Sequence, residues 1–146
     1  MTLPNGDVIS GSSDQTVKVW NVEEGVCRKT LVGHASWVTS LAVKSEKCVI
    51  SGSRDKTIKF WDIGAGTCLL TLDGHTDCVK TLVAEYDMGV LVSGSWDKTI
   101  KVWDLESGEM KKSMTGHSDW VMSLVSIGKG RIASGSVDET IKIWEV

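Results

Sequence analysis

The strongest constraint on this chain is an internal repeat with a period of 41 or 42 residues. Four aligned copies of one segment are SGSSDQTVKVWN at 10–21, SGSRDKTIKFWD at 51–62, SGSWDKTIKVWD at 93–104 and SGSVDETIKIWE at 134–145. Three Gly-His pairs keep the same spacing, at 33–34, 74–75 and 116–117. A period of this length is typical of chains in which each repeat buries its apolar surface against neighbouring copies.

Each copy predicts four short β-strands. Residues 37–43 and 48–53 are rich in β-branched and apolar side chains and flank a polar turn, which predicts a hairpin. Residues 57–61 alternate with a period of two, and residues 68–72 follow a glycine-containing turn. No window shows helical spacing. We therefore expect fourteen strands, with the first strand missing from the first copy and the fourth missing from the last.

The unit that runs from Gly-His to Trp-Asp resembles the WD repeat, whose blade is four antiparallel strands. The resemblance covers essentially the whole chain. It implies an all-β fold, a partial or oligomer-completed β-propeller of four-stranded antiparallel blades. The expected divisions are a partial blade at 1–32, repeats at 33–73 and 74–115, and a repeat at 116–146 that lacks its last strand.

Each complete copy also supplies a His, a Ser, an Asp and a Trp, which suggests a hydrolase triad. The resemblance implies instead a structural hydrogen-bond network, because a buried imidazole needs partners for both of its nitrogens. Three similar copies also argue against a single active site, so we predict no catalytic residue and a chain that is not an enzyme. The predicted network residues are His34, Ser51, Asp55, Trp61, His75, Ser93, Asp97, Trp103, His117, Ser134, Asp138 and Trp144.

Composition and charge argue against nucleic-acid binding, a membrane span and a disulfide framework. The net charge of -3, with both signs interspersed, argues against nucleic acid. No apolar run approaches the roughly 20 residues of a membrane helix, and the first residues do not resemble a secretory signal. Cys27, Cys48, Cys68 and Cys78 are predicted to be reduced, buried thiols, and we expect no metal and no cofactor. These features predict a cytoplasmic protein, with the nucleus as the alternative.

The variable positions of the repeat predict a binding surface. In the propellers that this chain resembles, partners dock on the face formed by the start of each first strand and the turn between the second and third strands. The corresponding positions hold Trp37, Cys78, Trp120, Ser13, Arg54, Trp96 and Val137. Trp and Arg most often carry binding energy at interfaces, so the four residues of these types are the predicted anchors. Filling gaps between blades is the alternative role for the tryptophans, and Arg54 is a candidate for a cation–π pair with one of them.

These observations favour a scaffold or adaptor that binds proteins or peptides. One alternative is the targeting or substrate-recognition region of a larger enzyme, such as a kinase or a ubiquitin ligase. Another is a hydrolase that uses one His-Ser-Asp set. Because an open arc of blades exposes two apolar faces, we expect either a part of a longer protein or self-association that completes a ring.

Overall fold

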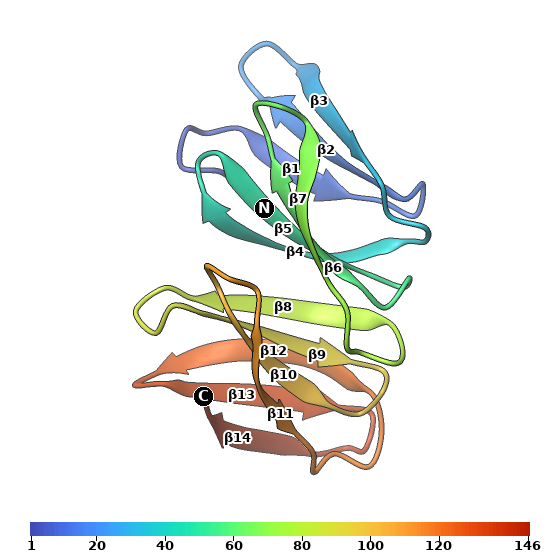
Figure 1. Cartoon of the computed structure of the whole chain (residues 1–146), viewed down its shortest axis with the longest axis vertical. Helices are drawn as coiled ribbons and strands as arrows, with labels where there is room; N and C mark the ends of the chain where they lie inside the picture. The colour runs from blue at the N-terminus through green and yellow to red at the C-terminus, as the bar shows by residue number, and fades with distance from the viewer.

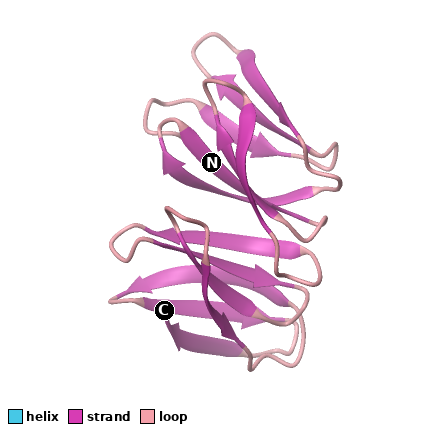
Figure 2. Cartoon of the chain, in the orientation of Figure 1, coloured by secondary structure: helices cyan, strands magenta, loops and turns pink.

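A computed structural model describes all 146 residues and contains strands and loops but no helix (Figure 2). The strands form four antiparallel sheets that follow one another along the long axis of the molecule (Figure 1). This arrangement confirms the predicted all-β propeller class. No helix is available that could cross a membrane.

We call the four sheets blades 1 to 4. Blade 1 contains β1 (Val8–Gly11), β2 (Thr16–Asn21) and β3 (Val26–Val32). Blade 2 contains β4 (Val38–Ser45), β5 (Cys48–Ser53), β6 (Ile58–Asp62) and β7 (Thr67–Leu72). Blade 3 contains β8 (Val79–Glu85), β9 (Val90–Ser95), β10 (Ile100–Asp104) and β11 (Met110–Met114). Blade 4 contains β12 (Val121–Gly128), β13 (Arg131–Ser136) and β14 (Ile141–Glu145).

The burial of each strand reflects its place in the stack. In β5 and β9, the second strands of blades 2 and 3, every residue is buried, because another blade covers each face of the sheet. In β2 of blade 1 buried residues alternate with partly buried ones, and in β14 of blade 4 the alternation is between exposed and partly buried residues. The outer blades therefore have one covered face, and the inner blades have two.

The core lies between the blades rather than within one sheet. Three clusters of buried apolar side chains fill the spaces between successive blades. Trp61 of blade 2 packs against blade 1, and Trp103 of blade 3 packs against blade 2. Such an indole buries about 150 to 250 Å², so each blade interface depends heavily on the tryptophan near the end of a third strand.

The glycine of each Ser-Gly-Ser segment allows the next blade to approach. A Cβ atom on Gly94 of β9 would lie 2.7 Å from Val121 Cγ1 of blade 4. The same atom on Gly52 of β5 would lie 2.7 Å from Val79 Cγ1 of blade 3. Repetition of this glycine in the sequence is therefore a packing requirement.

The N-terminal residues differ from the sequence prediction. The first blade was expected to lack its first strand entirely, but Met1 and Thr2 pair with β1 where β4 pairs with β5 in blade 2. The amide of Ile9 donates to the carbonyl of Met1 at 2.8 Å, and Leu3 is buried. The prediction missed this segment because three residues are too short to show strand periodicity.

Two of the four cysteines are not buried, so that part of the prediction was wrong. Cys48 and Cys78 lie in the core, whereas Cys27 of β3 and Cys68 of β7 are exposed. The physical reason is that fourth strands form the outer edge of their blades, where most residues are exposed. All four thiols are unpaired.

Blade 4 presents an uncovered apolar face. Val125, Ile141 and Ile143 are 56%, 78% and 55% exposed. The equivalent residues of blade 2, Ala42, Ile58 and Phe60, belong to the buried cluster beneath blade 3. The exposed residues therefore have the character of a blade interface.

Candidate functional site

A hydrogen-bonded chain of side chains crosses blade 2. The Nδ1 atom of His34 lies 2.7 Å from Asp55 Oδ2, and its Nε2 atom lies 2.7 Å from Ser51 Oγ. The indole Nε1–H of Trp61 donates to Ser51 Oγ at 2.7 Å. Because the carboxylate accepts from Nδ1–H, Nε2 is left to accept from the serine hydroxyl. The chain ties the segment before β4 to β5, β6 and the turn between them.

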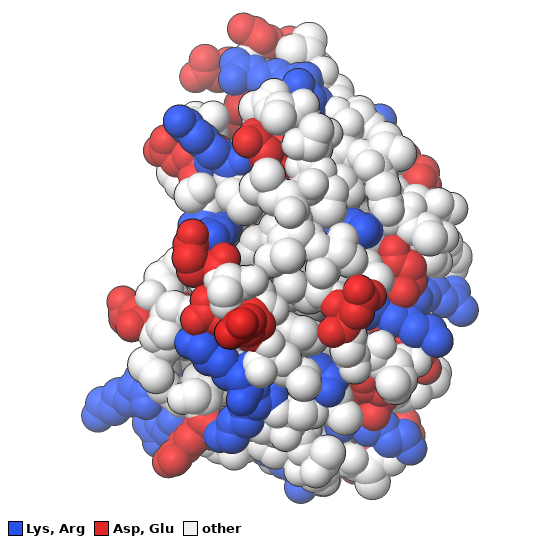
Figure 3. Space-filling model, viewed as in Figure 1, with Lys and Arg blue, Asp and Glu red and all other residues white.

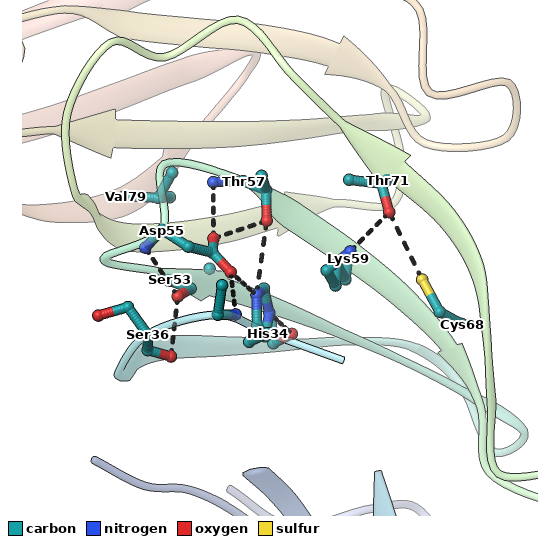
Figure 4. A network of polar contacts seen from close by, with 12 residues as sticks. His34, Ser36, Ser53, Asp55, Thr57, Lys59, Cys68, Thr71 and Val79 are labelled. Atoms are coloured by element: carbon teal, nitrogen blue, oxygen red, sulfur yellow. Dashed lines mark hydrogen bonds and ion pairs between the residues drawn. The ribbon is translucent and has the colours of Figure 1, made fainter. Parts of the chain in front are cut away.

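The turn between β5 and β6 is held by further bonds (Figure 4). Asp55 Oδ1 accepts from the amide of Thr57 at 3.0 Å and from its hydroxyl at 2.7 Å. Ser53 Oγ accepts from the amide of Asp55 and donates to the carbonyl of Ser36. Sequence reasoning did not include Thr57 and Ser53, although the recurring pattern Ser-Gly-Ser-x-Asp-x-Thr could have identified both positions.

The same network recurs in the next two blades. His75 lies 2.7 Å from both Asp97 Oδ2 and Ser93 Oγ, and Trp103 Nε1 donates to Ser93 Oγ at 2.8 Å. Blade 4 repeats these contacts with His117, Ser134, Asp138 and Trp144. The structure thus brings together every residue of the three predicted sets. In blade 1, Trp20 Nε1 donates to Ser10 Oγ at 2.9 Å and no histidine is present.

The glycine before each histidine allows the tryptophan of the same blade to pack against the backbone. Gly33 has a φ of +154°, and a Cβ atom there would lie 3.1 Å from Trp61 Cη2. The indole thus packs directly on the backbone beside His34. The same close approach recurs at Gly74 and Gly116, which explains why glycine precedes all three histidines.

In blade 2 the network carries its charge on the carboxylate of Asp55 rather than on the imidazole of His34. Burial lowers the pKa of His34, against the opposing effect of Asp55, and so favours the neutral ring. Burial acts to raise the pKa of Asp55, but hydrogen bonds from Thr57, Ala35 and His34 outweigh it and hold that pKa at about 2. Hydrogen bonds likewise hold the pKa values of Asp97 and Asp138 well below the usual range against the opposing effect of burial. Each of the three carboxylates is therefore ionised at neutral pH.

This geometry is unsuited to hydrolysis. The serines that would act as nucleophiles, Ser51, Ser93 and Ser134, have exposures of 0%, 0% and 1%. Each hydroxyl oxygen also accepts a bond from an indole, so it has no approach for a carbonyl carbon. The three cavities of the chain are lined by other residues. No group of three or more His, Cys, Asp or Glu residues is arranged to hold a metal ion.

A second constellation lies where the first strands begin. The amide of Arg54 donates to the carbonyl of Trp37 at 2.9 Å, which joins the two variable positions of blade 2. The Arg54 guanidinium carbon lies 5.0 Å from the ring centroid of Trp37 and 5.9 Å from that of Trp96. Arg54 therefore lies between an indole of its own blade and an indole of blade 3.

The row continues into blade 4. The rings of Trp96 and Trp120 are stacked, with centroids 4.5 Å apart and an interplanar angle of 14°. Trp37 and Trp120 are 51% and 41% exposed. We call Trp37, Arg54, Trp96 and Trp120 the rim surface. It is a continuous row of flat side chains that spans three blades.

The other predicted contact residues are placed differently. Cys78 is 0% exposed, so it cannot touch a partner, in contrast to the sequence prediction. Its small side chain fits beneath the surface at a position where the other blades have an exposed tryptophan. Val137 is 47% exposed, and its amide bonds to the carbonyl of Trp120, so it extends the row in blade 4. Ser13 is exposed in the corresponding turn of blade 1.

The stacked antiparallel blades and their buried His-Asp-Ser-Trp networks define an arc of a β-propeller. The WD domain, G-beta repeat family matches residues 2–21, 25–62, 66–104 and 108–145, and the chain belongs to this family. The matched segments are offset from the blades, since each later one begins near the fourth strand of one blade and ends with the third strand of the next. The WD40 propeller fold is generally a non-catalytic interaction domain.

Known proteins support the same assignment. The chain is similar to the structure of U3-55K and to the crystal structure of RRP9 WD40 repeats, each with 27% identity and a TM-score of 0.92. Each match covers 100% of this chain and 47% of the other, so the chain spans about half the length of these structures. A stretch of 31 residues is 55% identical to the Lissencephaly-1 homolog of Branchiostoma floridae and covers 21% of this chain and 8% of that protein.

Proposed function

We propose that the chain is a scaffold or adaptor module that binds a protein or peptide through the rim surface. The observation that carries this proposal is the unbroken contact of Trp37, Arg54, Trp96 and Trp120 across three blades. Exposed indoles beside a guanidinium supply large contact area with little conformational freedom to lose. The WD40 fold of U3-55K and RRP9 is consistent with such a role.

A triple variant tests this proposal. Trp37, Trp96 and Trp120 are replaced by alanine, and the proteins captured from a cell extract are compared by quantitative mass spectrometry with those of the wild type. Leu69→Ala with Met110→Ala is the matched control, because these side chains are 60% and 51% exposed on outer strands. We expect the triple variant to lose partners that the control retains. Equal capture by all three proteins would place binding elsewhere.

We also propose that the chain has no hydrolytic activity of its own, since its candidate nucleophiles are buried and already bonded. A generic esterase assay on the wild type tests this proposal, and any activity would contradict it. Loss of that activity in His75→Ala would assign it to the network of blade 3. If the chain serves a larger enzyme, such as a kinase or a ubiquitin ligase, we propose that its part is recognition.

Four unpaired thiols, two of them exposed, favour a reducing compartment such as the cytoplasm or the nucleus.

The uncovered face of blade 4 supports a further part of the proposal. We propose that Val125, Ile141 and Ile143 are covered in the working protein, either by further repeats or by a second copy of the chain. Their exposure, 78% for Ile141, contrasts with the burial of the equivalent residues of blade 2. Light scattering of the purified chain tests self-association, and a stable monomer would exclude the second copy.

A further inference from the structure

We propose that the rim surface binds an acidic peptide segment, whose carboxylate pairs with the guanidinium of Arg54 while an adjacent aromatic or apolar side chain lies on the exposed indoles. This inference rests on the function proposed above and specifies the chemistry of the partner. It follows from how Arg54 is held, from the bonds already made by nearby carboxylates, and from the environment of Trp96.

Arg54 lies beside two indoles and forms no ion pair. Its guanidinium carbon lies 5.0 Å and 5.9 Å from the ring centroids of Trp37 and Trp96, which is within cation–π range of both rings. The side chain of Arg54 donates no hydrogen bond within the chain, so the N–H groups of its guanidinium are free to donate to a partner. The ion pairs of the lysine and arginine side chains form elsewhere, at Arg28, Lys44 and Lys111. A cation is thus held in place on the surface without a counter-ion.

The carboxylates beside Arg54 in the sequence and in the next blade are already bonded. Asp55 Oδ2 accepts from His34 and from the amide of Ala35, and Asp55 Oδ1 accepts from Thr57. Asp77 Oδ1 accepts from the amide of Cys78 at 2.7 Å. Neither carboxylate forms an ion pair with Arg54, and Asp77 is an exposed residue. A carboxylate from outside matches the free edge, and a charged hydrogen bond of this kind is about twice as strong as a neutral one.

Trp96 can offer a partner apolar contact but no hydrogen bond. Its Nε1–H is buried and has no hydrogen-bond partner, so this indole offers a partner only its ring. The ring stacks on Trp120, which is 41% exposed. Arg54 is the only charged group of the rim surface, and the indole rings contribute flat apolar area. A basic peptide is disfavoured, because it would meet Arg54 and the exposed Lys56 of the same turn.

A random-sequence peptide display library is the probe for the first test. It is selected against the full chain, against the Trp37, Trp96 and Trp120 triple alanine variant, and against Arg54→Gln. Arg131→Gln is the matched control, because it removes the same charge from an exposed arginine far from the rim surface. Arg131 lies at the hairpin between β12 and β13, at the opposite end of β12 from Trp120. We expect the wild type and the control to enrich sequences with Asp or Glu beside an aromatic residue. Arg54→Gln is expected to lose the acidic preference, and the triple variant to lose enrichment altogether.

The second test measures affinity with a synthetic copy of one enriched peptide. Replacing its acidic residue with the matching amide should weaken binding to the wild type about tenfold or more and leave binding to Arg54→Gln unchanged. Added salt should reduce the difference. Arg54→Lys should restore part of the preference, since it keeps the charge but loses the planar fork.

The outcomes separate this inference from the proposed function. Enrichment of neutral or basic peptides, or equal affinity for the acidic peptide and its amide form, overturns the acidic partner. If those peptides still require the three tryptophans, the rim remains a binding surface. If the wild type enriches nothing beyond the triple variant, both proposals fail. Urea unfolding of each variant checks that exposed substitutions leave the fold intact.

Discussion

Ser93→Ala measures what the buried network contributes to stability, and Ser10→Ala provides its control. Ser93 Oγ serves both the imidazole of His75 at 2.7 Å and the indole of Trp103 at 2.8 Å, and it is fully buried. Removing the hydroxyl leaves two buried polar groups without partners. Each such group costs about 1–3 kcal/mol, so Ser93→Ala should lower the free energy of unfolding by about 2–6 kcal/mol.

The control makes the same change at the same repeat position. Ser10 Oγ accepts only from Trp20 Nε1 at 2.9 Å, and both residues are partly exposed, so water can replace the lost bond. We expect Ser10→Ala to cost less than about 1 kcal/mol. Both variants remove one hydroxyl group from a serine in a strand. They differ in that Ser93 contacts a histidine and is buried, whereas Ser10 has no histidine and is partly exposed.

Urea unfolding followed by tryptophan fluorescence and circular dichroism gives both values, provided that the two probes coincide and the m-value is unchanged. If the blades unfold separately, hydrogen exchange in β9 and β1 reports each one. Equal costs for the two substitutions would refute the idea that the network, rather than the serine alone, stabilises the blade.

Three further predictions concern packing, acid stability and thiol reactivity. Gly94→Ala should destabilise the chain by about 1–3 kcal/mol in urea, because a Cβ atom there would lie 2.7 Å from Val121 of the next blade. Gly135→Ala should cost clearly less, since only the Ser123 hydroxyl lies close to that position, and equal costs would contradict the packing argument. The pKa of Asp55 falls from 3.8 to about 2 on folding, so its ionised form adds about 2 kcal/mol to the free energy of unfolding. This stabilisation is complete above the pKa of the unfolded chain and is lost as the pH falls toward 2. Urea unfolding at several pH values should show this loss in the wild type and a smaller one in Asp55→Asn. A thiol reagent should label two cysteines quickly and two only on unfolding, because burial protects the second pair and raises the pKa of its thiols. The first pair is Cys27 and Cys68, and the second is Cys48 and Cys78.

The parts of the fold that follow from one repeat could be predicted from the sequence. Alternation of apolar residues located the strands, and the fixed spacing of His34, Ser51, Asp55 and Trp61 identified the members of a network. The reason is that these features depend on contacts within one blade or on contacts that every blade repeats. The exposure of Cys68 on an outer fourth strand could not be predicted, because a cysteine is found both in cores and on surfaces and its residue type does not show which.

The rim surface could be predicted only as a set of positions. That Arg54 lies between two indoles depends on the distance between adjacent blades, which no single repeat encodes. Cys78 shows the same limit, since its position in the repeat is that of Trp37 and Trp120, yet its side chain is fully buried. A variable position therefore identifies where the frame permits change without showing which side chain faces outward.

The network and the rim surface are mechanically connected. Asp55 follows Arg54 directly, and its carboxylate accepts from the amide of Ala35, two residues before Trp37. The bond from the Arg54 amide to the Trp37 carbonyl closes the same two segments beside the network. Because satisfied buried bonds resist movement more than solvated loop contacts do, the network fixes the backbone from which the rim residues project. The polar cluster that resembles an active site thus pre-organises the surface through which we propose that the chain binds.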